Sequence, residues 1–178
     1  MQATANPASS DYRDIIMAQL FSDLQIARFN ELYYQKRAQW HRRLSASANV
    51  ISALASSAVV TALLRDSVFG WFPLLWLILA MLAAVCAAVV PILQLDTKAS
   101  QLDKAAFGHA IVRDRIHKLL RDLKLSELDD VHLGRKAEID SLRTTLGALD
   151  EPPHSSVINS CWDQVLHEYP SDQAWTVV

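Results

Sequence analysis

Six histidines and two cysteines are the side chains of this 178-residue chain with the greatest capacity to bind a metal or act as a nucleophile. The histidines lack the spacing and the acidic neighbours typical of a zinc site, so we expect them at the surface or at interfaces. They are His41, His109, His117, His132, His154 and His167. Cys86 and Cys161 have the spacing of neither a disulfide framework nor a metal knuckle, and we expect two reduced packing residues.

Motifs that position a reacting group are also missing from the sequence. It contains no Gly-rich phosphate loop, no serine nucleophile elbow and no local Cys–His pairing. Asp129 and Asp130 are adjacent acids, but they suit the start of a helix better than an acid pair, because the helix dipole favours negative charge there. We therefore expect no enzymatic activity, no metal and no cofactor. The formal net charge of −2 argues against a nucleic-acid partner.

A different polar set lies in a stretch without charge. No charged side chain occurs between Arg43 and Arg65, yet the stretch contains an amide and several hydroxyls. Four of them are spaced so that they share one face of a helix: Ser45, Asn49, Ser52 and Ser56. In lipid this polar stripe must contact protein or water, because lipid provides no hydrogen-bond partner for an amide.

The polar stripe has two compatible interpretations. It can pack within the chain against a small face formed by Ala80, Ala84 and Ala88. Alternatively, because two helices per chain cannot enclose a channel, the stripe can face other copies and line a pore after assembly. Both hold if the stripe packs at rest and turns inward in an active state. We take the four residues as the predicted pore or oligomer face.

Two charge-free windows must position the stripe. Hydrophobic residues make up 51% of the chain and charged residues 20%, but the two kinds are segregated. Windows 44–64 and 73–93 each match the roughly 20 residues that cross about 30 Å of hydrocarbon, and the second favours a span over a buried soluble helix. Only "RDSVFGWF" (65–72) separates them, which predicts a helical hairpin. No cleavable signal is visible, so we expect the first span to direct insertion.

Basic residues flank this hairpin on one side. "KRAQWHRR" (36–43) precedes the first window, Lys98 and Lys104 follow the second, and the turn contains only Arg65. Because positive residues stay inside, both termini should be cytoplasmic. The predicted membrane anchors are Lys36, Arg37, Trp40, Arg42, Arg43 and Trp71. The alternative role of segment 36–43 is to bind anionic headgroups, at about 1 kcal/mol per basic residue.

Two long helices of nearly equal length, at 11–43 and 94–124, should continue the spans into the cytoplasm. Their apolar positions repeat at helical spacing. The repeating residues are Ile16, Leu20, Leu24 and Ala27 in the first helix, and Leu95, Ala99, Leu102, Ala106, Ile116, Leu120 and Leu123 in the second. Equal lengths on either side of a hairpin predict an antiparallel stem in which Leu20 and Leu24 lie near Ile116 and Leu120.

A third helix should begin in "SELDD" (126–130) and stop near Gly147. Ser126 is the predicted cap, with Asp129 at the capping-box position. The last helix, 155–168, follows a linker and should bury an apolar stripe of Val157, Ile158, Cys161, Trp162 and Val165.

The sequence thus predicts an all-α fold: a two-span transmembrane hairpin whose helices extend into a cytoplasmic antiparallel stem, plus two further cytoplasmic helices. The predicted parts are an N-terminal cytoplasmic helix at 1–43, the hairpin at 44–93, cytoplasmic helices at 94–150, and a linker with a short helix at 151–178.

This layout resembles the SLATT family, the two-transmembrane effector modules of bacterial conflict systems. The resemblance extends from about residue 28 to 168. It is carried by "ELYYQKRAQWHRR" before the first window, "DTKASQLDKAAFGHAIVRDRIHKLL" continuing from the second, and then "SELDD" and "LDEPPHSSV". Family members often have a further aromatic segment where this chain ends in "SDQAWTVV".

The resemblance implies a bacterial inner-membrane effector without catalytic residues. Such proteins act with a nucleotide-sensing or other cytoplasmic sensor partner, and form pores or perturb the membrane to arrest an infected cell. We expect the lipid bilayer and further copies of the chain as partners. Two other functions stay open: a constitutive membrane scaffold or receptor subunit that docks a partner through its stem, and a helical toxin that inserts its hairpin late.

Overall fold

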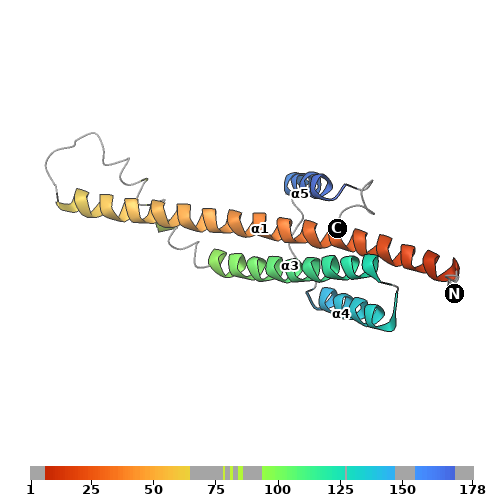
Figure 1. The fold of residues 1–178 in the computed structure, drawn as a ribbon. Helices are drawn as coiled ribbons and strands as arrows, with labels where there is room; N and C mark the ends of the chain where they lie inside the picture. The colour runs from red at the N-terminus through yellow and green to blue at the C-terminus, as the bar shows by residue number, and fades with distance from the viewer. Residues whose placement is uncertain are drawn as a thin grey trace. The chain divides into compact units, whose positions relative to one another are not determined.

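The computed structural model describes residues 7–64, 94–126, 128–146 and 155–170, together with Ile78, Met81, Ala84 and Val85. The side chains of 7–11 and 55–64 are outside this description. All regular structure in the described residues is α-helical, which confirms the predicted fold class. The helices are α1 (Pro7–Leu64), α3 (Leu95–Leu125), α4 (Asp130–Leu146) and α5 (Ser155–Glu168) (Figure 1). Among these helices, none is long and apolar enough to cross a membrane.

The chain forms two compact units. Unit 1 comprises Met1–Lys36 and Asp103–Val178, and unit 2 comprises Arg37–Leu102. Helices α1 and α3 contribute residues to both units. The second charge-free window lies outside the described residues except at four helical positions, all of which are exposed.

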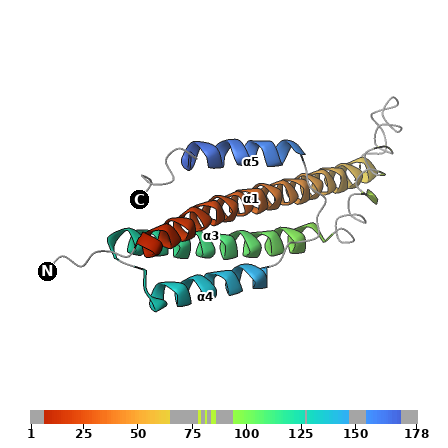
Figure 2. The same cartoon turned by 90° about the vertical axis from the view of Figure 1, so that its right-hand side faces the viewer.

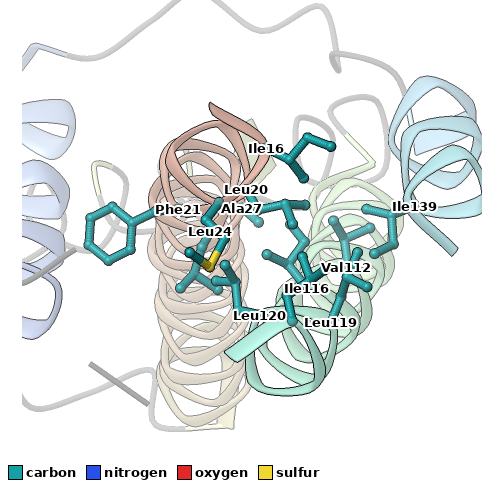
Figure 3. Close-up of a cluster of buried hydrophobic side chains, with 12 residues drawn as sticks. Ile16, Leu20, Phe21, Leu24, Ala27, Val112, Ile116, Leu119, Leu120 and Ile139 are labelled. Atoms are coloured by element: carbon teal, nitrogen blue, oxygen red, sulfur yellow. The ribbon is translucent and has the colours of Figure 1, made fainter. Parts of the chain in front are cut away.

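The core of unit 1 is built between α1 and α3, which lie side by side (Figures 1 and 2). Figure 3 shows Leu20 and Leu24 of α1 directed toward Ile116 and Leu120 of α3. Leu24 and Ile116 are both 0% exposed, so the predicted antiparallel stem is confirmed here. Every apolar position predicted for the two stem helices is buried.

Helix α4 packs on α3, and Ile139 contributes its side chain to the same core (Figure 3). Gly108 allows this close approach, because a Cβ at that position would collide with the end of the Leu146 side chain. The predicted cap of this helix is wrong. Ser126 ends α3 instead, since its N–H and its hydroxyl both donate to the carbonyl of Asp122, at 3.0 and 2.8 Å.

Asp129 caps α4 in place of Ser126. Its Oδ1 accepts the backbone N–H of His132 at 2.9 Å. This bond, followed by the charge of His132, holds the pKa of Asp129 below its ordinary value. The predicted C-terminal limit is accurate, because α4 ends at Leu146.

Helix α5 packs on α1 and spans the predicted residues. Cys161 and Val165 are fully buried in a separate cluster with Leu32 of α1. Val157 and Trp162 pack against that cluster, which confirms four positions of the predicted apolar stripe, while Ile158 is half-buried.

The backbone at Gln94, immediately before α3, is not helical. Gln94 has a φ of 46°, in the left-handed region, and its carbonyl accepts the N–H of Lys98 at 2.9 Å. Helix α3 therefore begins anew at Leu95. The expectation that one continuous helix runs from the second window into the stem is wrong at Gln94. By contrast, α1 passes residue 43 without a break.

Candidate functional site

Within unit 2, α1 buries no large apolar side chain among the described residues and exposes several. Ala38 and Ser45 are 0% and 3% exposed, whereas Val50 and Leu54 are 58% and 64% exposed. The same helix does the opposite in unit 1, where Leu20 is 1% exposed. A helix in water ordinarily buries its large apolar face, so the exposed apolar side chains of unit 2 are a candidate contact surface.

The polar stripe lies along the inner face and its edge. Ser45 is buried, Ser52 is half-buried and Asn49 is exposed. The side chain of Ser56 lies outside the described residues. The described part of the stripe therefore contains one hydroxyl packed in the protein and one amide available at the surface.

The predicted anchors fall into two groups. Trp40 is 51% exposed, and Arg42 and Arg43 are exposed beside it. Arg37 is only 8% exposed, with its guanidinium 5.9 Å from the centre of the Trp40 ring, an arrangement suited to cation–π attraction. Lys36 donates to the hydroxyl of Ser160 at 2.9 Å and so helps to hold α5. Trp71 lies outside the described residues.

Helix α3 supplies the second wall of unit 2. Leu95, Ala99 and Leu102 are buried at helical spacing, and each is at most 8% exposed. Lys98, between the first two, is exposed. The buried face of α3 in unit 2 thus combines two leucines with one alanine.

In unit 1, α5 is held on α1 by polar contacts as well as apolar ones. The guanidinium of Arg28 donates to both carboxylate oxygens of Glu168, at 2.6 and 2.8 Å. This hydrogen bond raises the pKa of Arg28 more than any other contact, while burial opposes the rise. Phe29 stacks on Trp162 with ring centres 4.6 Å apart. Helix α5 is therefore docked on α1 through these contacts and a small hydrophobic cluster of its own.

Glu31 links α1 to α3 beneath this contact. Glu31 is 5% exposed. Its carboxylate accepts hydrogen bonds from the guanidinium groups of Arg113, at 2.7 Å, and Arg28, at 3.0 Å. Glu31 was not among the residues predicted for the site, although its spacing is informative. Glu31 continues the buried spacing of Leu24 and Ala27, so an acid there needs a cationic partner on the facing helix.

Among the described histidines, three are buried, so of the two expected locations, surface or interface, the surface is excluded for them. His41, His109 and His132 are at most 8% exposed. His109 stacks on Tyr34 with ring centres 5.5 Å apart. Burial, and then the charge of Arg143, lower the pKa of His109 below its ordinary value, so the ring packs in its neutral form.

A groove of about 210 Å³ lies between α3 and α4. Its floor is formed by Leu119 and Ile139. Two ion pairs join the helices, Arg115 with Glu138 and Arg135 with Asp122. Each arginine thus has a carboxylate partner, and Lys118 is the other cation that lines the groove.

Cys161 and the acidic groups show no arrangement for metal or nucleophilic chemistry. Within the described residues, no three His, Cys, Asp or Glu side chains are grouped so that they could hold a metal ion. Cys161 is a free thiol whose pKa is raised by burial, although nearby Lys36 acts in the opposite direction. A protonated buried thiol is a packing group.

Comparison with known proteins gives no relative. No protein-family model, curated protein or solved structure matches this chain. The argument for function therefore depends on the residues and contacts described above.

Proposed function

We propose that this chain is a two-span effector of the bacterial inner membrane that assembles into homo-oligomers and permeabilises the membrane. The proposal adopts the SLATT-like layout, with windows 44–64 and 73–93 as the spans and both termini in the cytoplasm. The lipid bilayer and further copies of the chain are its partners. A cytoplasmic sensor, of the nucleotide-sensing class that the resemblance implies, would trigger assembly.

The single observation that carries the proposal is the reversed polarity of α1 in unit 2. Leu44, Val50 and Leu54 are exposed on a helix that buries Ser45. This pattern, with large apolar residues outside and a small polar residue inside, is expected when hydrocarbon surrounds the helix. The reversal begins directly after Arg43, where the charge-free window starts.

Asn49 supports the assembly part of the proposal. Its amide is exposed beside the exposed apolar side chains of Val50 and Ile51. An amide in hydrocarbon requires hydrogen-bond partners, and lipid offers none. A second copy or pore water would provide them, which makes the stripe the face that assembly buries or hydrates.

The proposal is tested by depolarisation after induced expression. Leucine at Ser52 and Ser56 makes the first span more apolar, so membrane insertion should persist. Pore formation should be lost because the stripe would be neither wet nor closely packed, and Asn49→Leu should act in the same direction. The assay follows membrane potential and growth, with the abundance of each variant in the membrane fraction as the reference.

Leucine at Ser57 and Thr61, which lie off the stripe, is the matched control and should leave activity largely intact. Equal depolarisation by the stripe variants and the parent at equal abundance would show that the stripe only packs. If the parent never depolarises cells, even when a fused oligomeriser forces assembly, the chain is a membrane scaffold that docks a partner instead.

A further inference from the structure

We propose that the basic rim of unit 2, made of Arg42, Arg43 and Lys98, binds the phosphate groups of anionic phospholipid headgroups. This inference rests on the proposed function, because it names the lipid that the inserted chain contacts. It concerns only residues of unit 2 and does not depend on the polar stripe or on pore formation.

The two helices of unit 2 bring the rim together. Helices α1 and α3 lie side by side in both views (Figures 1 and 2). Their buried residues in unit 2 are Arg37, Ala38, His41 and Ser45 on α1, and Leu95, Ala99 and Leu102 on α3. The two sets span about 12 Å and about 10 Å along their helices. Arg42 and Arg43 fall within the first set and Lys98 within the second, so the three cations lie at a common level.

These cations are directed away from the protein core. Arg43 and Lys98 are exposed, and within the described residues neither forms an ion pair. Arg42 is exposed as well. One exposed acid, Asp96, lies close by in the first turn of α3, which leaves the rim with a net positive charge. An anionic surface is therefore the complementary partner.

The surroundings of the rim favour a lipid over a soluble phosphate compound. Trp40 is 51% exposed immediately before the two arginines, and the exposed apolar face starts at Leu44 immediately after them. A phospholipid offers phosphate to the cations, an interfacial layer to the indole and acyl chains to the apolar face. A free phosphate ion would contact the cations alone.

The test uses the purified full-length chain in neutral detergent. Phosphatidylglycerol or phosphatidylcholine is titrated in, and the lipid-bound fraction is measured by native mass spectrometry. Each rim cation should contribute about fivefold in affinity. The double variant Arg43→Gln with Lys98→Gln should therefore bind phosphatidylglycerol about thirtyfold more weakly than the parent, with phosphatidylcholine binding unchanged.

Lys118→Gln with Arg121→Gln is the matched control, because it removes two exposed cations of unit 1. It should leave phosphatidylglycerol binding intact, and circular dichroism should show equal helix content in all variants. Equal affinity of the parent for the two lipids overturns the inference, and so does an equal loss in the control. Full competition by inorganic phosphate at matched concentration also overturns it, since the ligand would then be the soluble anion.

Failure of this inference can be distinguished from failure of the proposed function. Vesicles of phosphatidylcholine alone are loaded with the parent chain and washed at alkaline pH. A chain that resists extraction but shows no lipid preference keeps its membrane function and loses the rim site. A chain that alkali extracts is not a spanning protein, whatever its lipid preference.

Discussion

At the scale of single residues, Glu31 is a buried carboxylate that must be stabilised by hydrogen bonds. A carboxylate removed from water is costly unless charged hydrogen bonds replace its hydration. Glu31 is 5% exposed and has two guanidinium partners, Arg28 on its own helix and Arg113 on α3. Arg28 also reaches Glu168 of α5, so one buried acid lies at the junction of three helices.

Replacing this acid with an amide should destabilise unit 1. Glu31→Gln keeps the size of the side chain but removes the charge that both arginines contact, and should lower the free energy of unfolding by about 2 kcal/mol. Chemical unfolding followed by circular dichroism measures the change. Glu138→Gln is the control, since Glu138 is 62% exposed and its ion pair should contribute less than about 1 kcal/mol. Equal stability of parent and Glu31→Gln would contradict the structural role of Glu31.

At the scale of elements, α5 differs from the other helices of unit 1 in how it is held. Helices α1, α3 and α4 share one core, whereas α5 has a separate cluster against α1. Trp162 contributes its stacking contact with Phe29, and Cys161 is fully buried beneath it. A helix that packs through a small, separate hydrophobic cluster can open locally without unfolding the remainder of the unit.

Local opening of α5 can be measured through Cys161. In a Cys86→Ser background, a soluble thiol reagent should modify the parent slowly, because Cys161 is buried. Trp162→Ala should accelerate modification on the order of tenfold to hundredfold, since loss of an aromatic packing group costs about 3 kcal/mol. Leu166→Ala, at a position that is 48% exposed, should change the rate little. Rapid labelling of the parent, or no effect of Trp162→Ala, would contradict the docked arrangement of α5.

At the scale of the whole molecule, the distribution of Lys and Arg decides the proposed orientation. Segment 36–43 is basic and the start of α3 contains Lys98 and Lys104, while residues 65–72 contain one arginine. The positive-inside rule then places both termini in the cytoplasm. This orientation is also required by the proposed sensor partner, which would meet unit 1 on the cytoplasmic side.

Single cysteine probes test this topology. In a background without Cys86 and Cys161, cysteine is placed at Ser10, Ser67 or Ser171, and intact spheroplasts are treated with an impermeant thiol reagent. Labelling is expected at Ser67 and at neither terminal position. Labelling at Ser10 or Ser171 without labelling at Ser67 would reverse the orientation.

The sequence by itself determined which residues form helices and which positions on the stem helices are buried. Leu20, Leu24 and Ala27 repeat at helical spacing, so the face that they share follows from the geometry of the helix alone. The ends of α4 and α5 were also predictable, because Gly147 and Pro170 are residues that do not continue a helix.

Only the tertiary structure decided which neighbour covers each face. Spacing could not show that Asp129 rather than Ser126 caps α4, because both side chains can accept an N–H and the choice depends on where α3 ends. Nor could it show that His109 is buried, that Glu31 is held by two arginines, or that Lys36 contacts α5. A polar side chain becomes buried when a partner from a distant segment satisfies it, and that partner is known only once the helices have packed.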